Sequence, residues 1–326
     1  MSDKDFESVH FQLKQLADGV YAAIATEDGL AYSNAAIINM GDQTIVMDSF
    51  NSIEAGRDLR EAAEVLFDRA VSKLIISHPH DDHWNGNAAF DESTTILSTP
   101  AVLTAMQETA KEWQEDKENP DEYQKWIQGM KDRLSTEEDP RWQVGLERSI
   151  KLYEHVLATL PDFELRLPDE TFQGNQTFVG TKRKVELISV GPVHSTDDCY
   201  LVLPDDGIVF LADIGFFRMQ PFMGFCDINA WRKQIDHQLA GEYEVFVPGH
   251  GDVGGKAELA ELRKYMDAME KLVSETLSEV DEEAARQVEP PAPFDAWLMG
   301  GMGRLEANIN YLIKHLQGQE DTTKPN

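Results

Sequence analysis

The chain has 326 residues, of which 59 are acidic and 29 are basic, so its formal net charge at pH 7 is −30. A surface this negative repels phosphate groups, and we therefore expect no nucleic acid and no anionic membrane as a partner. The acidic excess favours solubility, with adaptation to a saline or alkaline habitat as the alternative. Hydrophobic residues make up 41% of the chain, as in ordinary globular proteins. No apolar run reaches the about 18 residues that a transmembrane helix needs.

The N-terminus and the cysteines bear on the cellular compartment. The first seven residues, Met-Ser-Asp-Lys-Asp-Phe-Glu, lack the basic and then apolar pattern of a secretory signal. Cys199 and Cys226 could pair with each other, but two cysteines exclude a framework of disulfides. We therefore expect a cytoplasmic protein.

The first hundred residues predict a meander of strands and then a strand–helix–strand unit, because short apolar runs alternate with Gly and Asp. Strands are expected at residues 19–25, 31–40, 43–48, 73–77 and 94–98. Residues 53–66 carry their apolar side chains on one helical face, formed by Ile53, Leu59, Ala62, Ala63 and Leu66.

Residues 100–160 are charged, helical in period and interrupted by Asn119-Pro120 and Asp139-Pro140. An amphipathic stripe recurs there at Trp142, Leu146, Ile150 and Tyr153. We interpret this stretch as a helical insertion and predict that it forms part of the substrate entrance. Padding of the domain flank and a homodimer contact are the alternatives.

Strands resume in the second half at residues 184–190, 199–203, 208–212 and 243–247. Helices are expected at 228–239 and 257–285, followed by a linker at Pro290–Pro293 and a last helix with Leu305, Ile309, Leu312 and Leu316 at core spacing. We predict one layered α/β domain over residues 1–326, with the insertion at about 100–160 and a helical tail at about 256–320.

One short segment concentrates the chemistry. The sequence His78-Pro-His-Asp-Asp-His83 directly follows the apolar strand at 73–77. His78 and His80 alternate on an extended segment, so both can reach one ion. Asp82 and His83 fall where the chain turns, so they can face a second ion. Imidazole and carboxylate suit zinc, and also iron or manganese, better than calcium.

Four side chains from one loop cannot complete two metal sites, so further ligands are expected at the carboxyl ends of other buried strands. Three residues have that position. His194 follows the strand at 184–190, Asp213 follows the run at 208–212, and His250 ends Val-Phe-Val-Pro-Gly-His.

This ordered set of motifs, from Gly19 to about Gly254, resembles the metallo-β-lactamase fold superfamily. The resemblance implies a four-layer αββα sandwich: two β-sheets packed face to face with helices outside. It implies a first metal held by His78, His80 and His194. It implies a second metal held by Asp82, His83 and His250. Asp213 would bridge the two, and Asp48 would orient the loop through a hydrogen bond.

The resemblance also implies a reaction. Two divalent ions, with zinc expected and iron or manganese as alternatives, lower the pKa of a bridging water. The resulting hydroxide would attack the substrate, and Asp82 and Asp213 are the predicted catalytic carboxylates. One class of β-lactamases has a cysteine where Asp213 stands, so the Asp-bridged set is more similar to glyoxalase II, lactonases and phosphodiesterases.

Three function classes stay open for a small-molecule substrate. The first is hydrolysis of a small ester, thioester, lactone or amide; Phe216 weakens the lactonase version, because similar lactonases carry a tyrosine there. The second is a phosphodiesterase, although Lys182-Arg183-Lys184, the only local basic cluster, is expected to face solvent. The third is a di-iron redox protein, against which His80 argues. A run of apolar residues after Asp213 is expected to form either a pocket wall or core: Phe216, Phe217, Phe222, Met223 and Phe225.

Overall fold

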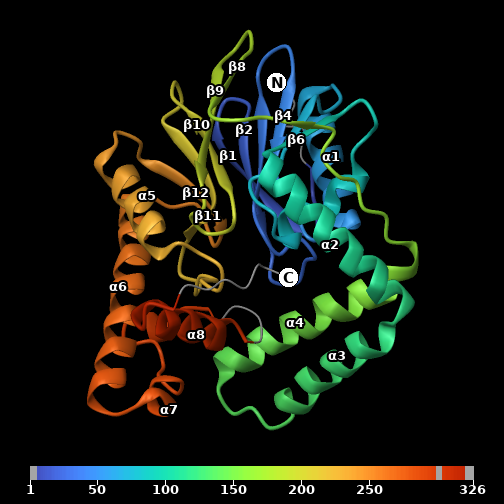
Figure 1. Ribbon diagram of the computed structural model, residues 1–326. Helices are drawn as coiled ribbons and strands as arrows, with labels where there is room; N and C mark the ends of the chain where they lie inside the picture. The colour runs from blue at the N-terminus through green and yellow to red at the C-terminus, as the bar shows by residue number, and fades with distance from the viewer. Residues whose placement is uncertain (1–5, 299–302, 320–326) are drawn as a thin grey trace.

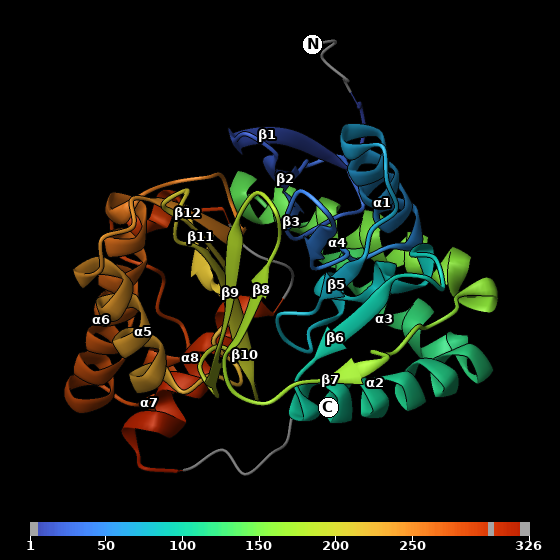
Figure 2. The ribbon, with the colours of Figure 1, turned by 90° about the horizontal axis from the view of Figure 1, so that it is seen from above.

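The structure is a computed structural model, and it describes residues 6–298 and 303–319. Two β-sheets pack face to face, and helices cover the outer face of each sheet (Figures 1 and 2). This arrangement confirms the predicted αββα sandwich. The predicted domain over residues 1–326 and the predicted helical tail to about residue 320 extend beyond the described residues. Residues 1–5 and those after 319 lie outside them.

Seven of the described strands form the first sheet, in the order β1 to β7. Neighbours are antiparallel from β1 to β4 and parallel from β4 to β7. The strands are β1 (Phe11–Ala17), β2 (Val20–Ala25), β3 (Ala35–Asn39), β4 (Thr44–Met47), β5 (Lys73–Ile75), β6 (Thr95–Ser98) and β7 (Glu170–Thr171). Sequence patterns missed β1 and β7, because these are the edge strands and most of their side chains are partly or fully exposed.

Five described strands form the second sheet, in the order β12-β11-β10-β9-β8. They are β8 (Gln176–Val179), β9 (Lys184–Gly191), β10 (Asp198–Leu203), β11 (Ile208–Phe216) and β12 (Val245–His250). β11 and β12 are longer than predicted, so Asp213 and His250 lie within strands. Buried side chains of both sheets, such as Ile38, Ile45, Leu201 and Val247, form the central core.

Helices on the first sheet begin with α1 (Ile53–Phe67), whose N-terminus is capped by Ser52. The predicted apolar face of α1 is confirmed for Leu59, Ala62 and Ala63, which are fully buried. The insertion forms three helices: α2 (Pro100–Glu118), α3 (Pro120–Leu134) and α4 (Pro140–Thr159). Each of the three has a proline in its first turn, where the missing N–H has no helical partner to lose.

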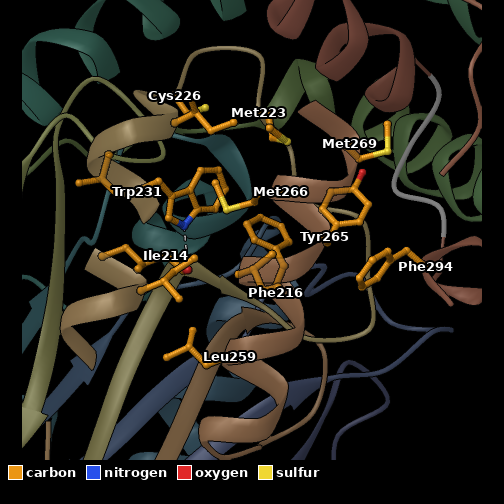
Figure 3. Packing of buried hydrophobic residues seen from close by; sticks show 14 of the residues in the cluster. Ile214, Phe216, Met223, Cys226, Trp231, Leu259, Tyr265, Met266, Met269 and Phe294 are labelled. Carbon is orange, nitrogen blue, oxygen red and sulfur yellow. Dashed lines mark hydrogen bonds between the residues drawn. The ribbon is translucent and has the colours of Figure 1, made fainter. Parts of the chain in front are cut away.

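Helices on the second sheet pack through a large apolar cluster around Trp231 and Tyr265 (Figure 3). Trp231 is fully buried, and its indole N–H donates to the carbonyl of Ile214 on β11 at 2.9 Å. The helices are α5 (Ile228–Ala240), α6 (Lys256–Glu279), α7 (Glu282–Ala285) and α8 (Arg304–Leu316). The tail helix expected at 257–285 is therefore two helices.

Two side-chain predictions for this half need correction or comment. Leu316 was expected in the core but is 37% exposed, as the last residue of α8. Cys199 and Cys226 are both buried and both free, so the possible pair does not form. Among the described helices, none combines the length and the hydropathy required to cross a membrane.

Candidate metal centre

The His78–His83 segment leaves β5 and turns at the carboxyl edge of the first sheet. A 3₁₀ turn at Asp81–His83 places Asp82 and His83 on the inner side of the loop. Trp84 is fully buried beneath it, and its indole N–H donates to the carbonyl of Pro79 at 2.9 Å. The loop is thus held by core packing as well as by backbone hydrogen bonds.

All seven predicted side chains converge. Ligand-type atoms of one group lie within 4.8 Å of one another, and the group consists of His78, His80, His194 and Asp213. A second such group consists of Asp82, His83 and His250. The residues come from both sheets: β5 leads to the loop, His194 follows β9, and Asp213 and His250 lie on β11 and β12.

Within the first group three imidazoles point at one another. His80 Nδ1 lies 3.1 Å from His78 Nε2 and 3.0 Å from His194 Nε2. Within the second group, His250 Nε2 lies 3.2 Å from Asp82 Oδ2. Asp213 contacts both groups: one carboxylate oxygen lies 3.3 Å from His194 Nε2 and the other 3.1 Å from His83 Nε2. This is the position expected of a bridging carboxylate.

The donor set fits divalent metal ions. Two of the buried polar atoms that lack a hydrogen-bond partner within the described structure are His83 Nε2 and Asp213 Oδ1, which face each other. Buried polar atoms are almost always satisfied, so such a pair calls for a further group between them. Nitrogen and carboxylate oxygen are the ligands of zinc, iron and manganese.

Electrostatics keep the imidazoles of His78 and His80 neutral, as a metal ligand must be. Burial, with His194 nearby, lowers the pKa of His80 to about 3. Burial also lowers the pKa of His78 well below its ordinary value, with His83 adding to the effect. Burial alone would raise the pKa of Asp213, but the imidazoles of His250 and His83 hold it well below the usual range.

The predicted role of Asp48 as an orienting residue agrees with its contacts. Its carboxylate lies 2.7 Å from His83 Nδ1 and accepts from both the backbone N–H and the hydroxyl of Ser77 at 2.8 Å. Since a carboxylate accepts, His83 Nδ1 carries the proton, and the lone pair of Nε2 points into the centre. Asp48 also has φ +62°, a left-handed conformation that Asp tolerates better than most residues.

Asp198 shapes the second ligand loop, a role that sequence reasoning missed. Its carboxylate accepts from the backbone N–H groups of Val193, His194 and Ser195 at 3.0, 2.9 and 2.9 Å. The usual signal is an Asp that precedes the N–H groups from which it accepts, whereas Asp198 follows them, so no local pattern marked this role.

The third ligand loop requires glycine. A Cβ on Gly249 would lie 1.9 Å from Asp213 Oδ1, so a side chain there would displace the shared carboxylate. The loop is fastened to the first sheet by Asn34, whose side chain donates to the carbonyls of Pro248 and Gly251 at 2.9 and 2.8 Å. Ser33 donates to the backbone carbonyl of Asp82. Sequence reasoning missed Ser33 and Asn34, because nothing local to them marks a long-range contact.

A cavity of about 330 Å³ opens onto the centre, with His80, Asp82, Asp213 and His250 at its base. Its walls include residues of all three insertion helices: Trp113, Tyr123, Leu152, Tyr153 and Val156. The helical insertion therefore lines the space in front of the centre, as its place in the chain predicted, and does more than pad the flank.

The apolar run after Asp213 divides between the two expected roles. Phe222 lines the cavity and lies with its ring centroid 5.8 Å from that of His80. Phe216 is fully buried and stacks on His250 at 4.9 Å and 14°. Phe217 and Met223 join the core, and Phe225 lines an adjoining cavity.

The prediction for the basic cluster was wrong in one residue. Arg183 is 8% exposed, because its guanidinium donates to the carbonyl of Asn39 and pairs with Asp206 at 2.5 Å. Arg183 thereby links the turn before β9 to Asn39, the last residue of β3 in the first sheet.

A buried set of histidines and aspartates at one edge of an αββα sandwich defines a metal-binding protein. The chain belongs to the metallo-beta-lactamase superfamily, whose family model matches residues 28–250. Most members of this superfamily are metal-dependent hydrolases.

Known proteins agree with this membership. A metallo-beta-lactamase from Pontibacter korlensis has a similar structure, with a TM-score of 0.55 and 15% identity over 79% of this chain and 99% of that one. Another from Hirschia baltica has a TM-score of 0.53 and 13% identity over 78% of this chain and 97% of that one. At these identities the likeness shows the fold alone.

A linear primary-alkylsulfatase from Pseudomonas sp. (strain ATCC 19151) is 24% identical over 252 residues, which make up 74% of this chain and 46% of that protein. The chain therefore spans about half the length of this curated relative.

Proposed function

We propose that this chain is a hydrolase that holds two divalent ions and cleaves a small ester, thioester, lactone or amide. Zinc is the expected metal. The observation that carries the proposal is the convergence of two ligand groups around Asp213 at the base of a cavity. His78, His80, His194 and Asp213 would hold the first ion. Asp82, His83 and His250, together with Asp213, would hold the second.

The residues divide the work by position. When bound, two divalent ions supply a nucleophile at neutral pH by acidifying a water, and they polarise the bond to be cleaved. Asp48 orients the imidazole of His83, and Asp198 holds the backbone of the loop that carries His194. The carboxylate of Asp82 faces the cavity, and His83 and His250 keep its pKa below the usual range against the opposing effect of burial. It is therefore ionised at neutral pH, as a carboxylate that holds a metal ion must be.

A sulfate ester is the second candidate substrate. The similarity to an alkylsulfatase supports it, although the chain spans only 46% of that protein. A phosphodiesterase function has less support, because Lys182, Arg183 and Lys184 are absent from the described lining of the cavity. Four further points stay predictions from the sequence: the alternative of a di-iron redox protein, the homodimer, the cytoplasmic location and the lack of nucleic-acid or membrane partners.

Elemental analysis and a substrate panel test the proposal. Protein purified without chelator should contain two equivalents of transition metal, mainly zinc. The panel combines p-nitrophenyl butyrate, an acyl thioester, a γ-lactone, a β-lactam, bis-p-nitrophenyl phosphate and hexyl sulfate. We expect hydrolysis of the ester, thioester, lactone or β-lactam. This activity should be lost on dialysis against chelator and restored by zinc. Folded and active protein without metal would refute the metal assignment.

A further inference from the structure

Arg304 brings a positive charge to the cavity from outside the region that the family model matches, which ends at residue 250. It is the first residue of α8, in the C-terminal tail. In Figure 1, α8 and the insertion helix α4 both lie below the sheets. Among the described residues that line the cavity, Arg304 is the only lysine or arginine.

This guanidinium is left with free donors. No carboxylate of the described residues lies within the 4.0 Å of Arg304 that would define an ion pair. Its one hydrogen bond there is a long one, from Nη1 to the carbonyl of Gln220 at 3.3 Å. Arg232, on α5, contrasts with it, since it pairs with both Asp267 and Glu270 at 3.1 and 2.7 Å. In a chain with 59 acidic and 29 basic residues, a cation in a cavity without an acidic partner calls for an explanation.

The other charges of the cavity do not supply that partner. Asp82 and Asp213 face the imidazoles of the centre. Asp81 also lines the cavity, but it forms no ion pair with Arg304. An arginine presents a planar fork of donors that matches the oxygens of a carboxylate or a sulfate. The lining also has an apolar part, with Trp113, Leu152, Val156 and Phe222, beside the polar side chains of Asn51 and Asn85.

We propose that Arg304 is a specificity-determining residue that binds an anionic group of the substrate, so that this hydrolase prefers anionic esters with an apolar body. This inference rests on the proposed function. The anionic group that Arg304 binds can belong to either of two kinds of substrate. It is a carboxylate on the acyl arm, at a distance from the cleaved bond, or the sulfate of a sulfate ester, at the cleaved bond itself. The chemistry that Arg304 recognises is the same in both.

Two isosteric esters test the proposal with the metal-loaded protein. Mono-p-nitrophenyl glutarate carries a carboxylate where p-nitrophenyl valerate carries a methyl group. A charge-assisted hydrogen bond changes affinity by about 10- to 100-fold, so the wild type should prefer the glutarate by at least about tenfold in kcat/KM, after subtraction of the uncatalysed rate. Arg304→Gln should abolish this preference, mainly through KM, and leave the valerate rate within about twofold. Arg304→Lys should keep part of the preference.

The control is Arg286→Gln, in the same tail, where Arg286 pairs with Glu282 on α7 at 2.6 Å and does not line the cavity. It should leave both esters unchanged. Equal loss of both esters in Arg304→Gln, with unchanged metal content, would overturn the proposal, as would an unchanged preference. If Arg304→Gln fails to fold, Arg304→Lys decides. A kcat/KM of Arg304→Lys for the glutarate that does not exceed its kcat/KM for the valerate counts against the proposal.

A binding measurement separates this inference from the proposed function. If the wild type cleaves no ester, the proposed function fails, but calorimetric titration with pentanoate, pentanamide and hexyl sulfate still tests Arg304. Tighter binding of the anions than of the amide, weakened about tenfold or more in Arg304→Gln, supports the site. Equal anion binding by both proteins overturns it. Release of sulfate from hexyl sulfate would place the anion at the cleaved bond, whereas a preference for the glutarate alone would place it on the acyl arm.

Discussion

Replacement of Asp48 by asparagine should weaken the second metal site without unfolding the protein. The two side chains have nearly the same shape, and Asn also tolerates the left-handed φ of +62°. The amide oxygen can still accept from the N–H of Ser77, 2.8 Å away. Its NH₂ group, however, would face His83 Nδ1 at the position where the carboxylate oxygen lies at 2.7 Å.

Two donors cannot share that contact, so His83 must move or change its tautomer. With the proton on Nε2, His83 no longer offers a lone pair to the centre. Loss of such an orienting partner typically lowers metal affinity by about 10- to 100-fold. Asp48→Ala should cost more, because the N–H and hydroxyl of Ser77 and the ring of His83 all lose their acceptor. At about 1 to 3 kcal/mol for a buried unsatisfied donor, and without full additivity, a loss of about 3 to 5 kcal/mol is expected.

Chelator competition with zinc measures the two affinities, and urea denaturation of the metal-free protein measures stability. The control is Asp18→Asn, since Asp18 is 90% exposed and pairs with Lys182 at the surface. In Asp48→Asn, one zinc should dissociate about 10- to 100-fold more readily than in the wild type, while the other changes less. Two zinc ions bound with wild-type affinity would refute the tautomer argument.

The other predictions concern the shared carboxylate, the cavity wall and pH. Asp213→Ala should lower metal occupancy and turnover together, because its carboxylate contacts both groups. Asp213→Cys should retain more metal, since thiolate is a zinc ligand; elemental analysis beside kinetics checks both, and two metals with normal rates in Asp213→Ala would exclude the bridging role. Trp113→Ala should raise KM for apolar substrates several-fold with kcat nearly unchanged, because Trp113 lines the cavity without being part of the centre. The pKa of Asp81 is raised from 3.8 to about 7, so its charged form destabilises the folded state increasingly as pH rises from about 4 to 7. Metal-free Asp81→Asn should then exceed the wild type in stability by about 2 to 4 kcal/mol above pH 7, with the gain vanishing toward pH 4. Urea denaturation across this pH range tests the sign, and a gain that grows on acidification would contradict it.

The convergence of the seven site residues could be predicted because their signals are local. Three histidines and two aspartates lie within the six residues of the His78–His83 segment, directly after an apolar run. His194, Asp213 and His250 follow or end other apolar runs, and such runs bring their carboxyl ends to one edge of a layered fold. That these residues hold two metal ions is the proposal that elemental analysis will test.

The helices, the inner strands and the edge strand β12 were likewise predictable from their sequence patterns, whereas the other three edge strands were not. β1, β7 and β8 expose much of one or both faces, so their sequences lack the continuous apolar runs of central strands. Buried Arg183 was misjudged for a related reason. Its partners are distant in sequence, since Asp206 lies in the turn between β10 and β11 and Asn39 ends β3 of the first sheet.

The sequence by itself determined the fold class, the histidines and aspartates that converge and the presence of a helical insertion, because all three are encoded in periods and motifs a few residues long. Only the tertiary structure decided what stands around the centre. It put Phe222 in the cavity and Phe216 in the core, turned Tyr153 and Trp113 of the insertion toward the centre, and brought Arg304 from the far end of the chain. Such contacts join residues that are distant in sequence, and they depend on how whole layers pack, which no local pattern specifies.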